Sequence, residues 1–461
     1  MRNRDLRAGA RHPSPGAMHH RQRGREAMTA LAAAAIVGTL TLAGCGGGGG
    51  DDGPQINQAL ARQGQNVFRY ETFGDETQWS DTLKMNDVIQ SAVDPVTALS
   101  VGLKVDSDAL PASVVEAIKA GQVDLTSPQT TLALIELNAV VGVKGTVTTA
   151  ADGTKTLQRV GITCGLCHST VDNSASHALG LPDGIGKRLD GWPNRQLNPG
   201  AIIALSPYFD SLGADAAATV RGQLNSWGPG MYDPRYIVGG GITDPGVSHP
   251  AVIPPAYGLF GLKNAIFTGD GDVQHEPVGP VAYWNRYVSV TQMGGHGTFL
   301  DPRLPQGKGG GTGVNNIGAD GVDRVTAHLP ALQEYQYSID APAAPAGSFD
   351  AAAAARGQVL FAGKANCASC HSGELFTDAT EGKLHPADAS VAKDKVYITL
   401  SATGQWRTSP LKGVWQHAPY FHDGSAATLA DVVAMYNDNP KKPLDLTARE
   451  RADLVEYLKS L

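Results

Sequence analysis

Residues 355 to 371 read ARGQVLFAGKANCASCH, a helix-forming segment followed directly by a loop with two cysteines and a histidine. Alanine, arginine, glutamine and leucine all favour a helix at its start. Gly357 and Phe361 are four positions apart and therefore lie on one face of that helix. The string Cys-Ala-Ser-Cys-His closes the segment at His371. The segment predicts a helix that leads into a compact group of sulfur and nitrogen ligands.

The same cysteine spacing occurs a second time in the chain, as Cys-Gly-Leu-Cys-His at residues 164 to 168. C-x-x-C-H is the attachment sequence of c-type haem. Its two thiols bond the vinyl groups of the porphyrin, and its histidine becomes the proximal iron ligand. We therefore predict two covalently bound c-type haems. The predicted attachment residues are Cys164, Cys167, His168, Cys367, Cys370 and His371.

Paired cysteines also bind zinc or act as redox-active dithiols. A zinc site built from four cysteines would leave both histidines without a role. A dithiol motif would be expected beside a βαβ pattern, which neither string shows clearly. Haem attachment uses both thiols and the histidine of each string, and it is the reading that we adopt.

The N-terminus has the pattern of an export signal. Arginines precede an apolar run that begins at Met28, and small residues then lead to Cys45. The run is too short to span a membrane. We expect residues 1–44 to be a cleaved signal peptide resembling that of bacterial lipoproteins, and residues 45–57 to be a glycine-rich tether. Cys45 would carry the lipid, with a free cysteine as the alternative, and the protein would be a periplasmic or outer-membrane lipoprotein.

The charge of the chain is acidic. It carries 37 Lys and Arg against 44 Asp and Glu, a formal net charge of −7. Without residues 1–44, which hold seven arginines, the net charge would be about −12. Such a surface repels nucleic acid and attracts basic proteins. We predict no nucleic-acid partner and a small, basic electron-donor or electron-acceptor protein.

A repeated spacing predicts two tandem units. ARQGQNVF, with Gly64, repeats the Gly-x-x-x-Phe spacing of the segment around Gly357, but about 90 extra residues separate it from its cysteines. We predict a mainly α fold of two cytochrome-c-like haem domains, the first with a long insertion; the alternative is a chance match. The predicted parts are an N-terminal haem domain at 58–340, its insertion at about 69–160, a linker at 341–347 and a C-terminal haem domain at 348–461.

Three stretches resemble the bacterial di-haem cytochrome c peroxidase superfamily, which includes the di-haem enzyme that matures methylamine dehydrogenase. They are LPALQEYQYSIDAP (329–342), the segment 355–371 and APYFHDGSAATLADVV (418–433). The resemblance is weaker upstream, and residues 69 to 160 match no module of the family. It implies a peroxide-reactive N-terminal haem, an electron-transfer C-terminal haem and a tryptophan between them. It also implies calcium, which the family often binds at the domain junction.

The resemblance assigns the bridging tryptophan to Trp192, within GIGKRLDGWPNRQLNP at 184–199. An indole between two macrocycles can carry an electron hole. The alternative is a tryptophan of the core or of an interface. Trp227, Trp284 and Trp415 are the competing candidates.

The sixth ligand of the second haem falls in a predicted helix that starts with a capping box, Thr428 to Asp431. The resemblance implies a methionine here in the peroxidases, and the aligned position is Tyr436. A tyrosine there resembles the maturation enzyme, although Tyr436 would equally complete the apolar face of the helix. Met435 lies one residue earlier, about 100° away around the helix.

The open side of the first haem is harder to assign. Met293 is a candidate ligand, and Glu276 or His275 is a candidate acid–base group for splitting an O–O bond. Each has a structural role as its alternative.

These patterns predict an exported di-haem redox enzyme that reacts with peroxide or oxygen at haem 1 and passes electrons through haem 2. Two other functions stay open. One is a non-catalytic electron-transfer lipoprotein with both irons six-coordinate. The other is a di-haem oxygenase of the rubber-cleaving kind, whose haem faces an apolar tunnel.

Overall fold

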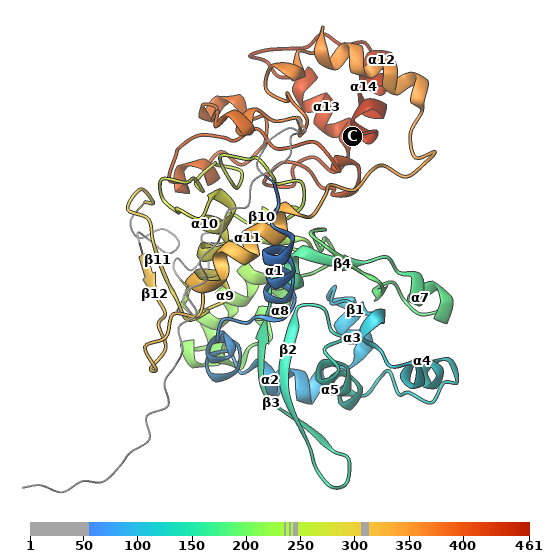
Figure 1. Ribbon diagram of the computed structural model, residues 1–461, viewed down its shortest axis with the longest axis vertical. Coiled ribbons are helices and arrows are strands. Elements are labelled where there is room, and N and C mark those ends of the chain that lie inside the picture. The colour runs from blue at the N-terminus through green and yellow to red at the C-terminus, as the bar shows by residue number, and fades with distance from the viewer. Residues whose placement is uncertain (1–54, 235–236, 239–240, 243–247, 306–312) are drawn as a thin grey trace, which may run out of the picture. The chain divides into compact units, whose positions relative to one another are not determined.

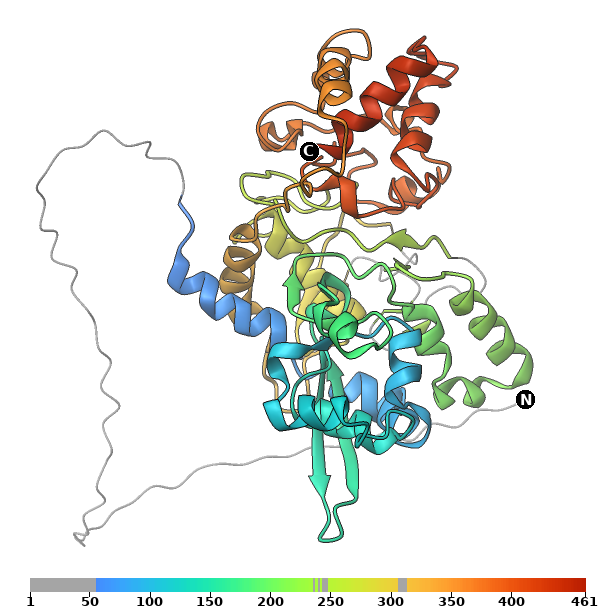
Figure 2. The same cartoon turned by 90° about the vertical axis from the view of Figure 1, so that its right-hand side faces the viewer.

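The computed structural model describes residues 55–234, 237–238, 241–242, 248–305 and 313–461 (Figures 1 and 2). The expected signal peptide, Cys45 and most of the tether lie outside the described residues. The described part is mixed, because short two-stranded sheets accompany the helices, whereas the sequence predicted a mainly α fold. Within it, no helix is long and apolar enough to cross a membrane.

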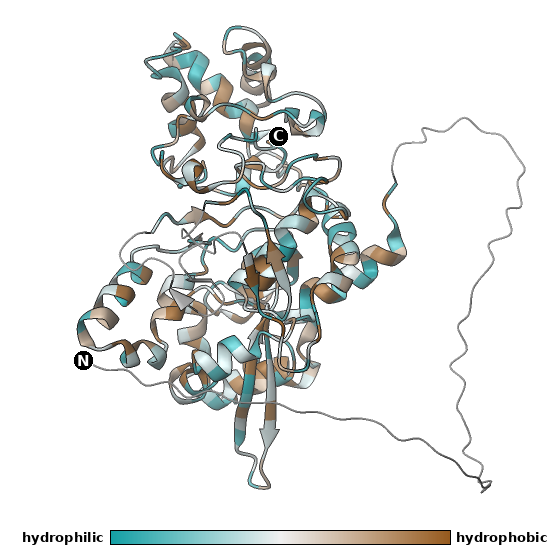
Figure 3. Cartoon of the chain, turned by 90° about the vertical axis from the view of Figure 1, so that its left-hand side faces the viewer, coloured by the Kyte–Doolittle hydropathy of each residue, from teal (hydrophilic) through white to brown (hydrophobic). Residues whose placement is uncertain are grey.

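The helices up to residue 225 are α1 (Gln58–Tyr70), α2 (Met85–Ala92), α3 (Pro95–Ser100), α4 (Ala112–Lys119), α5 (Pro128–Glu136), α6 (Gly165–His168), α7 (Ser174–Leu179), α8 (Pro199–Ala204) and α9 (Ala214–Asn225). The later helices are α10 (Pro280–Tyr287), α11 (Leu329–Tyr337), α12 (Ala351–Ala362), α13 (Leu429–Asn437) and α14 (Ala448–Lys459). In Figure 3 most of them carry both hydrophilic and hydrophobic residues, the pattern of helices with one buried face.

The strands pair two by two. The parallel pair is β1 (Val105–Asp106) with β5 (Ile185–Gly186). The antiparallel pairs are β2 (Val143–Thr149) with β3 (Lys155–Ile162), β4 (Ser169–Val171) with β6 (Arg188–Asp190), β7 (Met231–Tyr232) with β10 (Ala251–Val252), β8 (Ile237–Val238) with β9 (Gly241–Ile242), and β11 (Thr298–Leu300) with β12 (Gly313–Asn315).

Two pairs of helices meet at a glycine. Helix α1 packs on α11, and α12 packs on α14 (Figure 1). A Cβ atom at Gly64 would lie 1.9 Å from the carbonyl oxygen of Ala331. A Cβ atom at Gly357 would lie 2.1 Å from the carbonyl oxygen of Asp453. Both contacts require glycine, because a side chain at either position would push the two helices apart.

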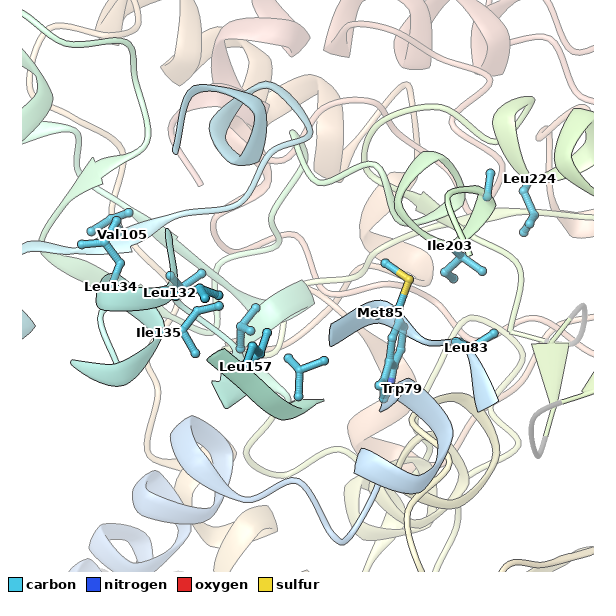
Figure 4. Close-up of a cluster of buried hydrophobic side chains, with 14 of the residues drawn as sticks. Trp79, Leu83, Met85, Val105, Leu132, Leu134, Ile135, Leu157, Ile203 and Leu224 are labelled. Atoms are coloured by element: carbon cyan, nitrogen blue, oxygen red, sulfur yellow. The ribbon is translucent and has the colours of Figure 1, made fainter. Parts of the chain in front are cut away.

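Residues 69–160 form helices and a long hairpin. Helices α2, α4 and α5 lie in this segment, and the β2–β3 hairpin was not expected from the sequence. Its turn is closed by Gly153, which has a φ of 88°. Side chains of this segment, such as Trp79 and Leu132, share one core with Leu224 of α9 (Figure 4). The segment therefore packs into the structure instead of forming a separate core.

The C-terminal part has a core of its own around α12, α13 and α14. Phe361, Val433 and Leu454 are buried together there. Both expected capping boxes are present, at Thr428 for α13 and at Thr447 for α14. These caps fix the helix starts, because each satisfies backbone N–H groups that the first helical turn leaves free.

Candidate haem sites

The first C-x-x-C-H string lies on α6, between β3 and β4. Cys164, Cys167 and His168 line one cavity of about 170 Å³. The Nδ1 atom of His168 lies 3.0 Å from the carbonyl oxygen of Pro254. Only an N–H can hydrogen-bond to a carbonyl oxygen, so Nδ1 carries the proton and Nε2 is free to bind a metal. Burial lowers the pKa of His168 to about 4, which keeps the imidazole neutral.

The cavity has mostly apolar walls. Trp79, Met85 and Val160 line it from the 69–160 segment, and Trp284 and Met293 line it from α10 and the turn that follows. The backbone of Met293 is fixed there, because its carbonyl oxygen accepts a hydrogen bond of 3.1 Å from Nε1 of Trp79. An apolar cavity with two thiols and a free imidazole nitrogen fits a covalently attached porphyrin.

A smaller cavity of about 70 Å³ shares Cys164 and His168 with the first. Ser289 and Arg407 are among the polar residues that line it. Both offer hydrogen-bond donors next to the attachment residues. A cofactor attached at Cys164 therefore has an apolar side and a polar side within reach.

The second C-x-x-C-H string begins with a 3-10 turn, Cys367–Ser369. The Nδ1 atom of His371 lies 3.0 Å from the carbonyl oxygen of Phe376, so its Nε2 is also free to bind a metal. Burial lowers the pKa of His371 as well. The ring of Phe361 lies 6.3 Å from the imidazole, between centroids. The proximal histidine therefore has the same arrangement in both strings.

The thiols argue against the other uses of paired cysteines. The four cysteines of the two strings are free in the structure. Burial raises the pKa of Cys164 and of Cys167 to about 12, so neither has the low pKa of a reactive dithiol. A zinc site with four cysteine ligands is not formed within the described part of the chain. The single candidate metal cluster found there contains one cysteine, Cys370.

That cluster consists of Cys370, Asp378 and His385. The Nε2 atom of His385 lies 2.9 Å from a carboxylate oxygen of Asp378. Calcium prefers six to eight oxygen ligands, and a thiol and an imidazole do not supply them. The cluster is therefore no candidate for the calcium ion that the resemblance implied, which stays a prediction.

Tyr436 and Met435 both lie near the end of α13. Burial of the hydroxyl raises the pKa of Tyr436 to about 12, and the thiols of Cys367 and Cys370 act in the same direction. The hydroxyl is therefore close to the attachment cysteines of the second site. Tyr436 keeps 36% of its surface exposed, so it does not simply complete the core face of the helix. Met435 is partly buried against the C-terminal core.

Trp192 lies directly beside the first string. The N–H of Gly191 donates to the carbonyl oxygen of His168, at 2.8 Å. The indole of Trp192 meets that of Trp415 edge to face, with ring centroids 5.9 Å apart. Trp415 in turn donates its Nε1–H to the carbonyl oxygen of Pro342, at 3.1 Å. The sequence named both tryptophans as candidates for one role, and the structure brings them into contact.

Glu276 and His275 are held in ion pairs. Glu276 accepts a hydrogen bond of 2.7 Å from Nε of Arg286. His275 lies 2.7 Å from a carboxylate oxygen of Asp272, which also pairs with Arg303. Neither Glu276 nor His275 lines either of the two cavities. Their acid–base role stays a prediction without a contact to the first site.

Two buried arginines were missed by the sequence analysis. Arg195 has no hydrogen-bond partner for Nε and Nη1 within the described residues, and Arg407 has none for Nε. Burial lowers the pKa of each to about 10. No local pattern marks either residue, because their surroundings come from segments far away in the sequence.

The comparisons agree with this geometry. A family model described as RoxA-like, cytochrome c-like matches residues 405–441. Cytochrome-c peroxidase IdrP1 of Denitromonas iodatirespirans is 32% identical, over 32% of this chain and 52% of that protein. Methylamine utilization protein MauG of Methylorubrum extorquens is 32% identical, over 31% of this chain and 44% of that protein. The chain thus spans about half the length of the curated relatives that it matches.

A solved structure of hydrazine synthase from Kuenenia stuttgartiensis is also similar, with a TM-score of 0.31 and 19% identity, covering 50% of this chain and 76% of that chain. Two C-x-x-C-H strings with equally oriented histidines define a c-type cytochrome. The curated relatives and the family model support the resemblance to the di-haem cytochrome c peroxidase and MauG superfamily. They support covalently bound c-type haem.

Proposed function

We propose that the protein is an exported di-haem redox enzyme that reduces peroxide or oxygen at its first haem site and receives electrons through its second. The observation that carries this proposal is the cavity at Cys164, Cys167 and His168, where two thiols and a free imidazole nitrogen face mostly apolar walls. The haems supply the redox-active iron. The name of one relative, cytochrome-c peroxidase IdrP1, supports peroxide as the oxidant.

The side chains have distinct tasks in this proposal. His168 is held neutral and oriented by Pro254, so that it binds iron through Nε2. Trp79 and Trp284 exclude water from the cavity, and Met293 is its candidate ligand group. Trp192 and Trp415 form the electron path between the sites, supported by their ring contact. Glu276 and His275 do not line the cavity, so their acid–base role stays a prediction.

We further propose two tandem haem units with the expected boundaries, 58–340 and 348–461, joined by the linker 341–347. The two helix crossings at Gly64 and Gly357 support this division. So does the separate core of the C-terminal part. The insertion at 69–160 acts as a wall of the first cavity.

Export, lipid attachment at Cys45 and a small basic redox partner are proposed from the sequence. One saturated chain would bind a membrane only weakly, so several acyl chains are expected on the cysteine. Mass spectrometry of the mature protein tests this, because an unmodified N-terminus elsewhere contradicts the lipoprotein.

A second candidate is a di-haem oxygenase that acts on an apolar substrate. Two observations favour it: the family model that matches residues 405–441 is RoxA-like, and the cavity walls are mostly apolar. Incorporation of oxygen atoms from O2 into an apolar substrate distinguishes the two candidates, because the first candidate reduces its oxidant without transferring oxygen to a substrate.

The deciding experiment is electron paramagnetic resonance of the oxidised protein, before and after peroxide. An enzyme is expected to show a high-spin signal from the first haem that peroxide changes. Two low-spin signals that neither peroxide nor oxygen changes would instead indicate an electron carrier. The variants Cys164→Ala and Cys367→Ala, each expected to weaken one attachment, assign the signals, with Cys45→Ala as the control that keeps both haems.

A further inference from the structure

Arg407 reaches from the C-terminal part of the chain into the first haem site. Its backbone N–H donates to the carbonyl oxygen of Phe267, at 2.8 Å. Its Nη1 lies 3.4 Å from the carbonyl oxygen of Asn264. The side chain lines the smaller cavity together with Cys164 and His168. Arg407 is therefore a neighbour of the first site, although it lies 239 positions after His168 in the numbering.

Among the residues that the structure describes, none forms an ion pair with the guanidinium of Arg407. Its Nε is buried and has no hydrogen bond within the described residues. Arg188 pairs with Asp190 at 2.5 Å and Arg286 with Glu276 at 2.7 Å, whereas Arg195 shares with Arg407 buried nitrogen atoms that have no partner among the described residues. A buried guanidinium nitrogen without a hydrogen-bond partner is unfavourable. We therefore expect an anion that is not part of the polypeptide to pair with this guanidinium.

The chemistry of the cavity limits what that anion is. A group bonded to Cys164 and Cys167 through its vinyl carbons is apolar over most of its surface. Its charged groups are two propionate carboxylates, on the edge that does not carry the vinyls. Arginine is the side chain best suited to a carboxylate, because its N–H groups form charge-assisted hydrogen bonds.

We propose that Arg407 binds a propionate of the haem attached at Cys164 and Cys167, through its Nε–H. The proposal rests on the haem assignment of the proposed function but not on peroxide or oxygen reactivity. It makes Arg407 a positioning residue that the second unit supplies to the first site. The fixed positive charge also favours the reduced, less positive state of the nearby iron.

The test is Arg407→Gln in the full protein with both haems, measured by potentiometric titration with optical detection. The midpoint potential of haem 1 is expected to fall, because the propionate charge is no longer balanced, while that of haem 2 stays unchanged. Arg303→Gln is the matched control. Arg303 pairs with Asp301 at 2.7 Å, so its loss weakens the fold without removing a cofactor contact.

Arg407→Lys is the conservative variant. It keeps the charge and is expected to restore most of the haem 1 potential, while the propionate bending band in the resonance Raman spectrum shifts because the hydrogen-bond geometry changes. This variant also serves if Arg407→Gln does not accumulate. A haem 1 potential unchanged in Arg407→Gln, a shift of haem 2 alone, or an unchanged Raman band in Arg407→Lys overturns the proposal. A protein that reacts with neither peroxide nor oxygen would overturn the proposed enzymatic function and not the role of Arg407, because the potential shift is measured without a substrate.

Discussion

Tyr436 is a candidate sixth ligand of the second haem, because its hydroxyl lies within electrostatic range of Cys367 and Cys370. An anionic oxygen ligand favours ferric iron, and a neutral thioether favours ferrous iron. Tyr436→Met is therefore expected to raise the midpoint potential of haem 2, and Met435→Leu to change little beyond packing. Potentiometric titration of both variants checks this. A large shift in Met435→Leu with none in Tyr436→Met would make Met435 the ligand.

Asp190 joins four partners beside the first site. It accepts hydrogen bonds from Arg69, Arg188, Ser169 and Tyr335. Burial alone would raise its pKa, but the two arginines hold the pKa of Asp190 below its ordinary value of 3.8. Removing one member of a buried ion pair leaves an uncompensated charge, so Asp190→Asn is expected to cost about 3 kcal/mol.

This cost depends on pH with a definite sign. Because the folded pKa of Asp190 is depressed, its contribution to stability is complete above its unfolded value and is lost as the pH falls through the folded value. Urea unfolding of the wild type and of Asp190→Asn should differ near pH 6 and converge as the pH drops well below 4. A difference that persists unchanged into strong acid would contradict the assignment.

At the scale of elements, the two helix crossings make the sharpest prediction. Gly64→Ala and Gly357→Ala each place a Cβ within about 2 Å of a carbonyl oxygen on the facing helix. Overpacking of this kind costs roughly 1 to 3 kcal/mol, so both variants should unfold at lower denaturant concentration. Gly222→Ala on α9 is the control. It has open space around the position and should gain up to about 1 kcal/mol from helix propensity.

These elements also show what the sequence can predict. The Gly-x-x-x-Phe spacing and the capping box at Thr428 act over a few residues, and the helices predicted from them are confirmed. The β2–β3 hairpin was missed although its turn contains Asp152 and Gly153, a common turn pair. Arg407 and the contact of Trp192 with Trp415 depend on packing between distant segments, which no short pattern encodes.

At the scale of the whole molecule, the contact between Trp192 and Trp415 is the proposed electron path between the sites. Trp192→Phe and Trp415→Phe are each expected to slow electron transfer between the haems, because a smaller ring with a higher oxidation potential replaces an indole. Stopped-flow reduction followed at the absorbance of each haem measures this. Trp227→Phe serves as the control, since Trp227 is buried against Tyr232 away from the pair. Wild-type rates in all three variants would show that neither Trp192 nor Trp415 lies on the electron path.

The walls of the first cavity come from stretches that are far apart in the chain. They belong to residues 79–103, 143–168, 197–205, 251–267 and 284–293, with Tyr232, Pro234 and Tyr397. A haem attached at Cys164 would therefore contact all of these stretches. A chain that cannot attach it there should be digested readily by trypsin at lysines such as Lys84 and Lys104. The Cys367→Ala chain should stay resistant there. The cleavage pattern would then report, one site at a time, the order in which the chain acquires its two haems.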